Sequence, residues 1–378
     1  MKRLESIDVC RAVGALGVLM YHSVFGHLQE RAWQTGGLFL YLVILGCEGS
    51  RGVNLFLVVS GFCIHARSAA RNPDENPGFA AFWMRRLKRL YPPYLAALVL
   101  SVVALGLVGM VQVALVGTHL QGSITYRTLP ADASLGQIVM ALLTHLLLLL
   151  PFWPHSQDIV RNGPFWTLAL EEQLYLLYFL VPWLRRRIGM EQTVLVSLMV
   201  SLLYACWARP EVLHAGVEAW RLAPARWFEW CLGAWAVEIH LGKSRRPGWV
   251  ARPAVGLGVL ALAVLVDFGW VRGMVFQVAM EPLWGLGFFV LLNWLVEQEA
   301  AGRWAQRKAM AMLAFVGIFS YSLYLVHEPL LHVITPLAYI VWPPAVALPL
   351  CGLVCIPLAW LFFRRVEQPA LAWSRAAR

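Results

Sequence analysis

A histidine and an arginine inside an apolar run are the residues of this sequence best suited to chemistry. The run covers about residues 9–27 and contains Arg11 and His22. Their spacing places both on one face of a helix, with His22 about 16 Å above Arg11. That height is near the middle of a hydrocarbon layer about 30 Å thick, where an ionisable group is costly and usually faces protein or a wet cavity.

An imidazole at His22 can exchange a proton near neutral pH, so it can act as a general base or as a nucleophile. The residues alone do not separate these two roles. The alternative is a hydrogen-bonded core histidine, which is the commoner fate of a histidine on an apolar face. Mid-membrane depth above an aligned arginine favours the functional interpretation.

A second polar stripe follows in the run 164–184. Thr167, Glu171, Tyr175 and Tyr178 are spaced by four, four and three residues, which is one helix face. Glu172 instead aligns with apolar residues. Glu171 is therefore the better candidate for an inward role, although both acids could also be solvated charges at a helix start.

A cationic cluster precedes the third apolar run. Arg85, Arg86, Lys88 and Arg89 place four cations within five residues, just before Pro92-Pro93. Such a cluster is usually a topology signal in contact with anionic lipid. It is also a candidate phosphate site, because the arginine fork matches phosphate oxygens.

Two further motifs give weaker signals. Ser60-Gly61 is either a small-residue helix contact or a place where a ligand approaches the backbone. His327 and His332 are five residues apart with a proline between them, which is not the spacing of a zinc-binding helix. We therefore expect no metal site.

Composition identifies the class of protein that must position these residues. The chain has 378 residues, of which 60% are hydrophobic and 14% charged, with 18 tryptophans. This predicts a polytopic membrane protein. The net charge of +10 is better explained by basic cytoplasmic loops than by binding to nucleic acid. The seven cysteines form no CxxC pair, so we expect them to pack in the protein interior. We expect no cleavable signal peptide.

Eleven apolar runs occur along the chain, and the distribution of Lys and Arg between them indicates which runs cross the membrane. If the run at 135–153 re-enters or lies at the interface, 23 of the 31 Lys and Arg residues fall inside. Proline residues at 151 and 154 suit such a segment. We predict an all-α integral membrane protein with ten transmembrane helices, cytoplasmic N- and C-termini, and one polytopic domain over residues 1–378.

Taken together and in order, these motifs resemble the membrane acyltransferase-3 family. The resemblance rests on six pieces: Asp8-x-x-Arg11 with His22, Gly52-Val53 through Ser60-Gly61-Phe62, Arg85-Arg86-x-x-Arg89-x-x-Pro92-x-Tyr94, Trp166-Thr-Leu-x-x-Glu171-Glu172-Gln-x-Tyr175, Ser320-Tyr-Ser-Leu-Tyr324-Leu-x-His327, and Glu367-x-Pro369. Each piece is weak alone, but their order covers essentially the whole chain.

The resemblance implies a multi-pass inner-membrane enzyme of the EC 2.3.1 type. It would take an acyl group, acetyl in the first instance, from cytoplasmic acyl-CoA and deliver it to a hydroxyl. The implied acceptor is a carbohydrate, a glycolipid or a macrolide-like molecule at or across the bilayer. The implied catalytic residue is His22, and we take Glu171 of the polar stripe as the second catalytic candidate. The implied binding residues are Arg11, Asn54, Ser60, Gly61, Phe62, Arg85, Arg86, Arg89, Tyr94, Trp166, Tyr175 and Tyr324.

The sequence departs from the family pattern at two positions. Asn54 stands where an acid is common, and Leu57 stands where the second aromatic of a pair is common. The expected absence of a fused extracytoplasmic domain leaves room for a separate partner that completes transfer. The rival interpretation is a proton-coupled transporter, since buried His, Arg and Glu also mark that class. A non-catalytic membrane scaffold would leave Arg11 and His22 unexplained.

Overall fold

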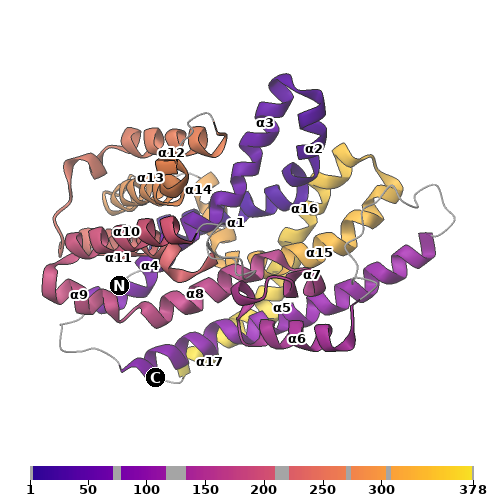
Figure 1. Ribbon diagram of the computed structural model, residues 1–378, viewed down its shortest axis with the longest axis horizontal. Helices are drawn as coiled ribbons and strands as arrows, with labels where there is room; N and C mark the ends of the chain where they lie inside the picture. The colour runs from indigo at the N-terminus through magenta and orange to yellow at the C-terminus, as the bar shows by residue number, and fades with distance from the viewer. Residues whose placement is uncertain are drawn as a thin grey trace. The chain divides into compact units, whose positions relative to one another are not determined.

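The computed structural model describes residues 3–70, 78–115, 133–208, 221–269, 274–303 and 308–376. Every regular element within these ranges is helical (Figure 1). The all-α class predicted from the sequence is therefore confirmed for the described chain. Short 3-10 turns join several helices, at Glu48–Arg51, Leu150–Phe152, Gly163–Phe165 and Gly248–Ala251.

The chain divides into two compact units. Unit 1 comprises Met1–Gly14, Arg51–Phe79 and Leu170–Ile318, and unit 2 comprises Ala15–Ser50, Ala80–Ala169 and Phe319–Arg378. Three helices carry residues of both units: α1 (Glu5–Met20), α5 (Phe79–Leu115) and α8 (Trp166–Leu177). The other helices of unit 1 are α4 (Gly52–Ala70), α9 (Leu180–Ile188), α10 (Met190–Trp207), α11 (Ala223–His240), α12 (Pro253–Asp267), α13 (Met274–Ala300) and α14 (Lys308–Ile318). Those of unit 2 are the π-helical turn η1 (Tyr21–Phe25), α2 (Gly26–Thr35), α3 (Gly37–Cys47), α6 (Leu135–Leu146), α7 (Ser156–Val160), α15 (Ser320–Val341), α16 (Pro344–Phe362), the π-helical turn η7 (Phe363–Glu367) and α17 (Gln368–Ala376).

Seven helical stretches of the described chain are long and apolar enough to cross a membrane. They are Glu5–Gln29, Gly37–Ala70, Phe79–Met110, Met190–Trp207, Val278–Ala300, Ser320–Val341 and Pro344–Arg375. Three shorter apolar helices, α6, α12 and α14, fall below the roughly 20 residues that a straight span needs. The chain is thus a multi-pass membrane protein, while the count of ten spans, the cytoplasmic termini, the re-entrant segment and the single domain stay predictions.

Helix α11 is the centre of unit 1. It packs against α4, α10 and α13, which lie beside it (Figure 1). A Cβ atom at Gly61 would collide with the Trp230 carbonyl oxygen, and one at Gly233 with the Val58 carbonyl oxygen. Small residues allow this close approach of helix backbones inside a membrane. The contact between α4 and α11 therefore requires a glycine at position 61.

The π-helical turn η1 is held between two helices of unit 2. It packs against α3 and α16, and α15 runs along α16. Glycines make room on both sides, since Gly46 of α3 faces the Phe25 ring and Gly352 of α16 faces the Ser23 side chain. The position of η1 is thus set by contacts with segments far away in the sequence.

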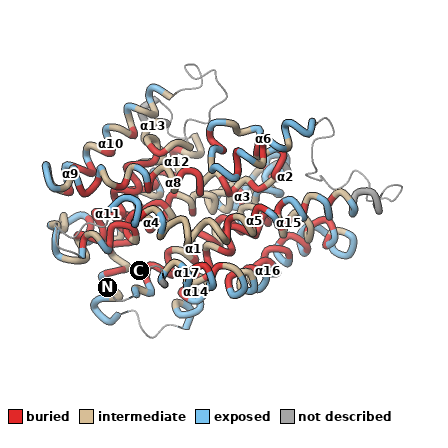
Figure 2. Tube along the Cα trace, turned by 90° about the horizontal axis from the view of Figure 1, so that it is seen from below, coloured by how far each residue is buried: buried red, intermediate tan, exposed pale blue. Residues whose placement is uncertain are grey.

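Apolar side chains cover the exposed faces of several unit 2 helices. Val99 on α5 and Leu353 on α16 are 63% and 61% exposed, and Figure 2 shows exposed segments along α16. Soluble monomers rarely expose apolar surface over this extent, whereas membrane helices present it to lipid. Burial therefore agrees with the membrane class inferred from composition.

Candidate active site

His22 lies in the π-helical turn η1 and is half-exposed. The Tyr21 ring stands at 4.9 Å from its ring in an edge-on arrangement, and the next two residues, Ser23 and Val24, are buried. A π turn inserts one extra residue into a helix and is frequent at functional sites. The turn anchors its neighbours in the interior while leaving part of the imidazole accessible.

A second histidine stands beside His22 within unit 2. The His327 ring of α15 is centred 5.2 Å from the His22 ring and is tilted by 56° against it. His327 is 1% exposed, and its Nδ1 lies 3.0 Å from the Leu323 carbonyl oxygen. Its Nε2 is buried and makes no hydrogen bond to any residue that the structure describes. The two imidazoles form a pair, which we call the histidine pair.

Tyr324 lies next to this pair. Its ring centre is 5.9 Å from that of His327, and its hydroxyl donates to the Pro164 carbonyl oxygen at 3.3 Å. The same hydroxyl accepts from Thr167 Oγ1 at 2.9 Å. These bonds tie α15 to the first turn of α8, where the half-buried Trp166 also lies.

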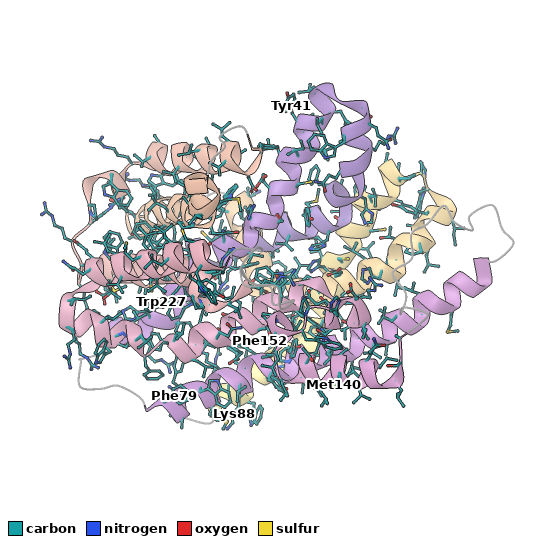
Figure 3. The ribbon with its side chains drawn as sticks, viewed as in Figure 1. Tyr41, Phe79, Lys88, Met140, Phe152 and Trp227 are labelled. Carbon is teal, nitrogen blue, oxygen red and sulfur yellow. The ribbon has the colours of Figure 1, made fainter. Side chains whose placement is uncertain are left out.

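The cationic cluster occupies the first turns of α5 in unit 2. Arg86 lies over the Phe82 ring at 5.7 Å, and Lys88, labelled in Figure 3, lies over the Trp373 ring of α17 at 5.2 Å. Arg85 is half-buried beside them. The Nε atom of Arg89 is buried and has no hydrogen-bond partner among the described residues. A buried guanidinium nitrogen in this state suits an anion as partner.

Tyr94, the residue directly after the prolines of α5, has a structural partner. It is 1% exposed, and its hydroxyl donates to the His145 carbonyl oxygen of α6 at 2.8 Å. Its ring packs edge-on against Phe165 at 4.9 Å. The structure thus places this predicted binding residue at a contact between α5 and α6.

In unit 1 the structure brings three predicted site residues together. Ser60 Oγ donates to Glu171 Oε1 at 2.8 Å, and the Tyr175 hydroxyl donates to the same oxygen. Trp230 Nε1 donates to Ser60 Oγ at 3.3 Å. Glu171 and Ser60 are half-buried, whereas Tyr175 and Trp230 are buried. This group, the Glu171 cluster, leaves Oε2 of Glu171 without a hydrogen bond to the described residues.

Arg11 contacts the segment that follows the Glu171 cluster on α4. Its Nη2 donates to Cys63 Sγ at 3.3 Å, and its Nη1 lies 3.5 Å from Asp8 Oδ1. Asp8 is paired more closely with Arg3, at 2.6 Å. Phe62, between Gly61 and Cys63, is buried, with its ring centred 6.2 Å from that of His240. Three consecutive residues of α4 thus contact different partners: Gly61 faces Trp230, Phe62 faces His240 and Cys63 accepts from Arg11.

Asn54 is part of a buried charged network in unit 1. Its Nδ2 donates to Glu229 Oε1 and to Glu281 Oε2, both at 2.6 Å. Arg226 pairs with the same two acids, at 2.7 and 2.6 Å. Arg51 pairs with Glu281 at 3.2 Å and also with Asp267. An aspartate at position 54 would set a third carboxylate against Glu229 and Glu281, so the amide suits this network better than the acid that is common in the family.

The family model of acyltransferase 3, described as an acyltransferase domain, matches residues 4–364 of the chain. The chain belongs to the acyltransferase-3 family. This confirms the family expected from the sequence motifs. No solved structure matches the chain.

Three relatives of this acyltransferase-3 member show the range of the family. "Putative peptidoglycan O-acetyltransferase YrhL" of Bacillus subtilis is 26% identical over 97% of the chain and 54% of its own length. A "Putative O-acetyltransferase" of Staphylococcus aureus (strain COL) is 26% identical over 47% of the chain and 24% of its own length. "Acyltransferase MdmB" of Streptomyces mycarofaciens is 26% identical over 86% of the chain and 78% of its own length. The chain thus spans about half of YrhL and a quarter of the Staphylococcus protein.

The sequence alone did not identify several polar residues of this acyltransferase-3 member as candidates for its site. His327 ends one of the six family motifs and lies three residues after Tyr324 on the same helix face, yet its sequence context did not predict a role at the site. Arg226 and Glu229 open α11 three residues apart, and both are buried. His65 and Glu238 form a further buried pair at 3.0 Å. Charges inside apolar runs were the signal that could have found all of them.

Proposed function

We propose that this chain is an O-acyltransferase that moves an acyl group, acetyl in the first instance, from cytoplasmic acyl-CoA to an acceptor hydroxyl. The observation that carries the proposal is the half-exposed His22 in its π-helical turn beside His327. Membership of the acyltransferase-3 family supports the reaction class. Acyl-CoA serves as donor substrate, and no metal enters the proposed reaction.

In the proposed reaction His22 acts as the general base. The acceptor hydroxyl gives its proton to the imidazole while its oxygen attacks the thioester carbonyl carbon. A carbon–oxygen bond forms, the carbon–sulfur bond breaks, and the imidazolium returns the proton to the departing CoA thiolate. A variant of this route has His22 attack the thioester first and carry the acyl group to the hydroxyl in a second step.

The Glu171 cluster of unit 1 contains the second residue that we propose to be catalytic. Glu171 receives hydrogen bonds from Ser60 and Tyr175 on one carboxylate oxygen, and the other oxygen can accept a bond from a substrate. We propose that Glu171 acts on the reacting groups and that Ser60 and Tyr175 orient it. Arg11, Asn54, Gly61, Phe62, Tyr94, Trp166 and Tyr324 complete the proposed substrate-binding residues.

The three arginines of the cationic cluster, Arg85, Arg86 and Arg89, are the proposed site for the CoA phosphates. We expect Arg85→Gln and Arg89→Gln each to raise the KM for acetyl-CoA by about 10-fold, because each removes a hydrogen bond between charged groups. The turnover at saturating donor should change much less, since a contact far from the reacting carbonyl stabilises ground and transition states alike. Steady-state kinetics with both substrates varied measures the two constants separately.

A lipid-contact role for the cluster predicts a different pattern. Expression or membrane insertion would then fall, while the KM for acetyl-CoA stays at the wild-type value in both variants. Lys88→Gln is the matched control, because Lys88 lies over the Trp373 ring and is expected to act through packing. An unchanged KM in both arginine variants removes the phosphate assignment.

The proposed reaction requires a defined topology. We propose ten spanning helices with both termini cytoplasmic and the segment 135–153 re-entrant, so that the cationic cluster faces the donor. In a cysteine-free background, Arg187→Cys should react only with a reagent that reaches the cytoplasm, and Asp158→Cys should react with an impermeant reagent added outside. The predicted outer loop at 209–223 falls mostly outside the described residues. Reaction of position 187 from the outside would contradict this topology.

We further propose that the acceptor is a hydroxylated molecule at or across the bacterial inner membrane. The printed names of YrhL and MdmB support a carbohydrate and a macrolide-like compound as the first classes to test. A screen should read mass shifts in cell-surface glycans and secreted metabolites after deletion and complementation of the gene.

The reaction itself is tested with purified protein. Acyl transfer releases one CoA thiol for each acyl group delivered, and the release must depend on both acetyl-CoA and an acceptor. A proton-coupled transporter would release no thiol, but it would acidify proteoliposomes in a substrate-dependent way. Acidification without release of thiol would show that the protein is a transporter and would contradict the acyltransferase proposal.

A further inference from the structure

We infer that His327 is the positioning residue that fixes the proton of His22, by accepting a hydrogen bond from the His22 ring on its Nε2 atom. The inference rests on the proposed function, because it assumes that His22 handles the acyl-transfer proton. It adds a residue to which neither the family motif nor the rejected zinc spacing assigned a role. It also assigns a purpose to a buried nitrogen that otherwise has no partner among the described residues.

The protonation of His327 follows from its surroundings. A carbonyl oxygen only accepts hydrogen bonds, so the contact of 3.0 Å with the Leu323 carbonyl places a proton on Nδ1. His327 is 1% exposed and forms no ion pair within the described chain, and burial without a counter-charge disfavours the imidazolium. The ring is therefore neutral, and its Nε2 carries a lone pair that can only accept.

The geometry of the histidine pair suits that bond. The bond is not formed in the structure, where Nε2 has no partner among the described residues, but the ring centres lie only 5.2 Å apart. A ring rotation that turns one nitrogen of each imidazole toward the other leaves about 3 Å between them, which is the length of a hydrogen bond. Tyr324 does not compete for Nε2, because its hydroxyl already bonds to Pro164 and Thr167. Hydrogen bonds of this kind also tighten when substrate binds.

The consequence for His22 is a defined tautomer. A proton held between His22 and Nε2 of His327 leaves the other His22 nitrogen with its lone pair, which is the form that a base or nucleophile requires. The same bond keeps the imidazolium in place after it has taken the acceptor proton. This is the role that an orienting carboxylate fulfils in other sites, here carried out by a neutral acceptor.

Two substitutions of His327 separate this role from a structural one. The side-chain amide of His327→Gln reaches the position of Nε2 and can accept from His22. The amide of His327→Asn reaches only the position of Nδ1 and can donate to the Leu323 carbonyl. We expect His327→Gln to keep kcat within about 10-fold of wild type, and His327→Asn to lose about 100-fold. The KM for acetyl-CoA should stay within about 2-fold in both variants.

A merely structural histidine would give the opposite order. If the bond to Leu323 were its purpose, His327→Asn would be the more active variant and the more heat-stable one, and the inference would fail. Equal activity of the two variants would overturn it as well. His332→Gln and His332→Asn repeat the exchange five residues later on α15 and should stay within about 2-fold of wild type.

The His22→Ala variant distinguishes an error in the role of His327 from an error in the proposed function. If His22→Ala retains acyl transfer, the role of His22 is wrong, whatever the His327 variants do. If His22→Ala is inactive and His327→Asn is fully active, the role of His22 stands and the histidine pair has no catalytic purpose. Thermal midpoints of all variants in the same detergent identify any that failed to fold.

Discussion

His22→Ala is expected to lower acyl transfer by about 1,000-fold or more while the protein still folds and inserts. The size of the effect follows from losing the only proposed proton acceptor, since positioned acid–base groups contribute about 100- to 10,000-fold. Folding should survive because the side chain is half-exposed and truncation leaves no large cavity. The measurement is acceptor-dependent release of CoA thiol by purified protein, together with its thermal midpoint.

His27→Ala is the matched control for this substitution. His27 lies five residues further along, on α2, and is exposed, so we expect wild-type turnover from its variant. A His22→Ala protein that keeps more than a few per cent of wild-type turnover would remove His22 from the mechanism. Intact mass after acid quench, with acetyl-CoA and no acceptor, distinguishes a base from an acyl carrier, because only the carrier gains an acetyl group.

Arg226→Ala is expected to destabilise the protein by about 3–5 kcal/mol, which is the usual cost of removing one partner from a buried ion pair. Arg226 is 2% exposed and pairs with Glu229, itself 1% exposed, and with Glu281. Without the guanidinium, two carboxylates remain together in the interior of unit 1. The measurements are the thermal midpoint and the monodisperse fraction after purification in detergent.

A double substitution distinguishes the loss of charge balance from the loss of packing. Arg226→Met with Glu229→Gln removes one charge of each sign and keeps the bulk, while Arg51 still pairs with Glu281. We expect this protein to recover at least half of the lost stability. Arg187→Ala, an exposed arginine over the Trp183 ring, should change stability by less than about 0.5 kcal/mol. Equal stability of Arg226→Ala and wild type would show that solvent reaches this network.

The sequence by itself determined the membrane class and the family, and it singled out His22 as a candidate. Each of these depends on local composition or on motif order, and the cost of an ionisable side chain in an apolar run needs no tertiary information. The same reasoning singled out Glu171, because four-residue spacing defines a helix face without knowledge of its neighbours. The polar partners of His22 and Glu171 could not be predicted from spacing along the sequence.

Tertiary structure decided which residues act together. Ser60 and Glu171 are 111 residues apart, and only the packing of unit 1 brings their side chains to 2.8 Å. His22 and His327 meet because η1 packs on α16, which runs along α15. The π turn that presents His22 depends on the same contacts, with Gly352 leaving room for Ser23. Hydrogen bonds and ring contacts act over a few ångströms, so they form only where helix packing brings two side chains together. The periodicity of a single segment does not predict which helices pack against each other.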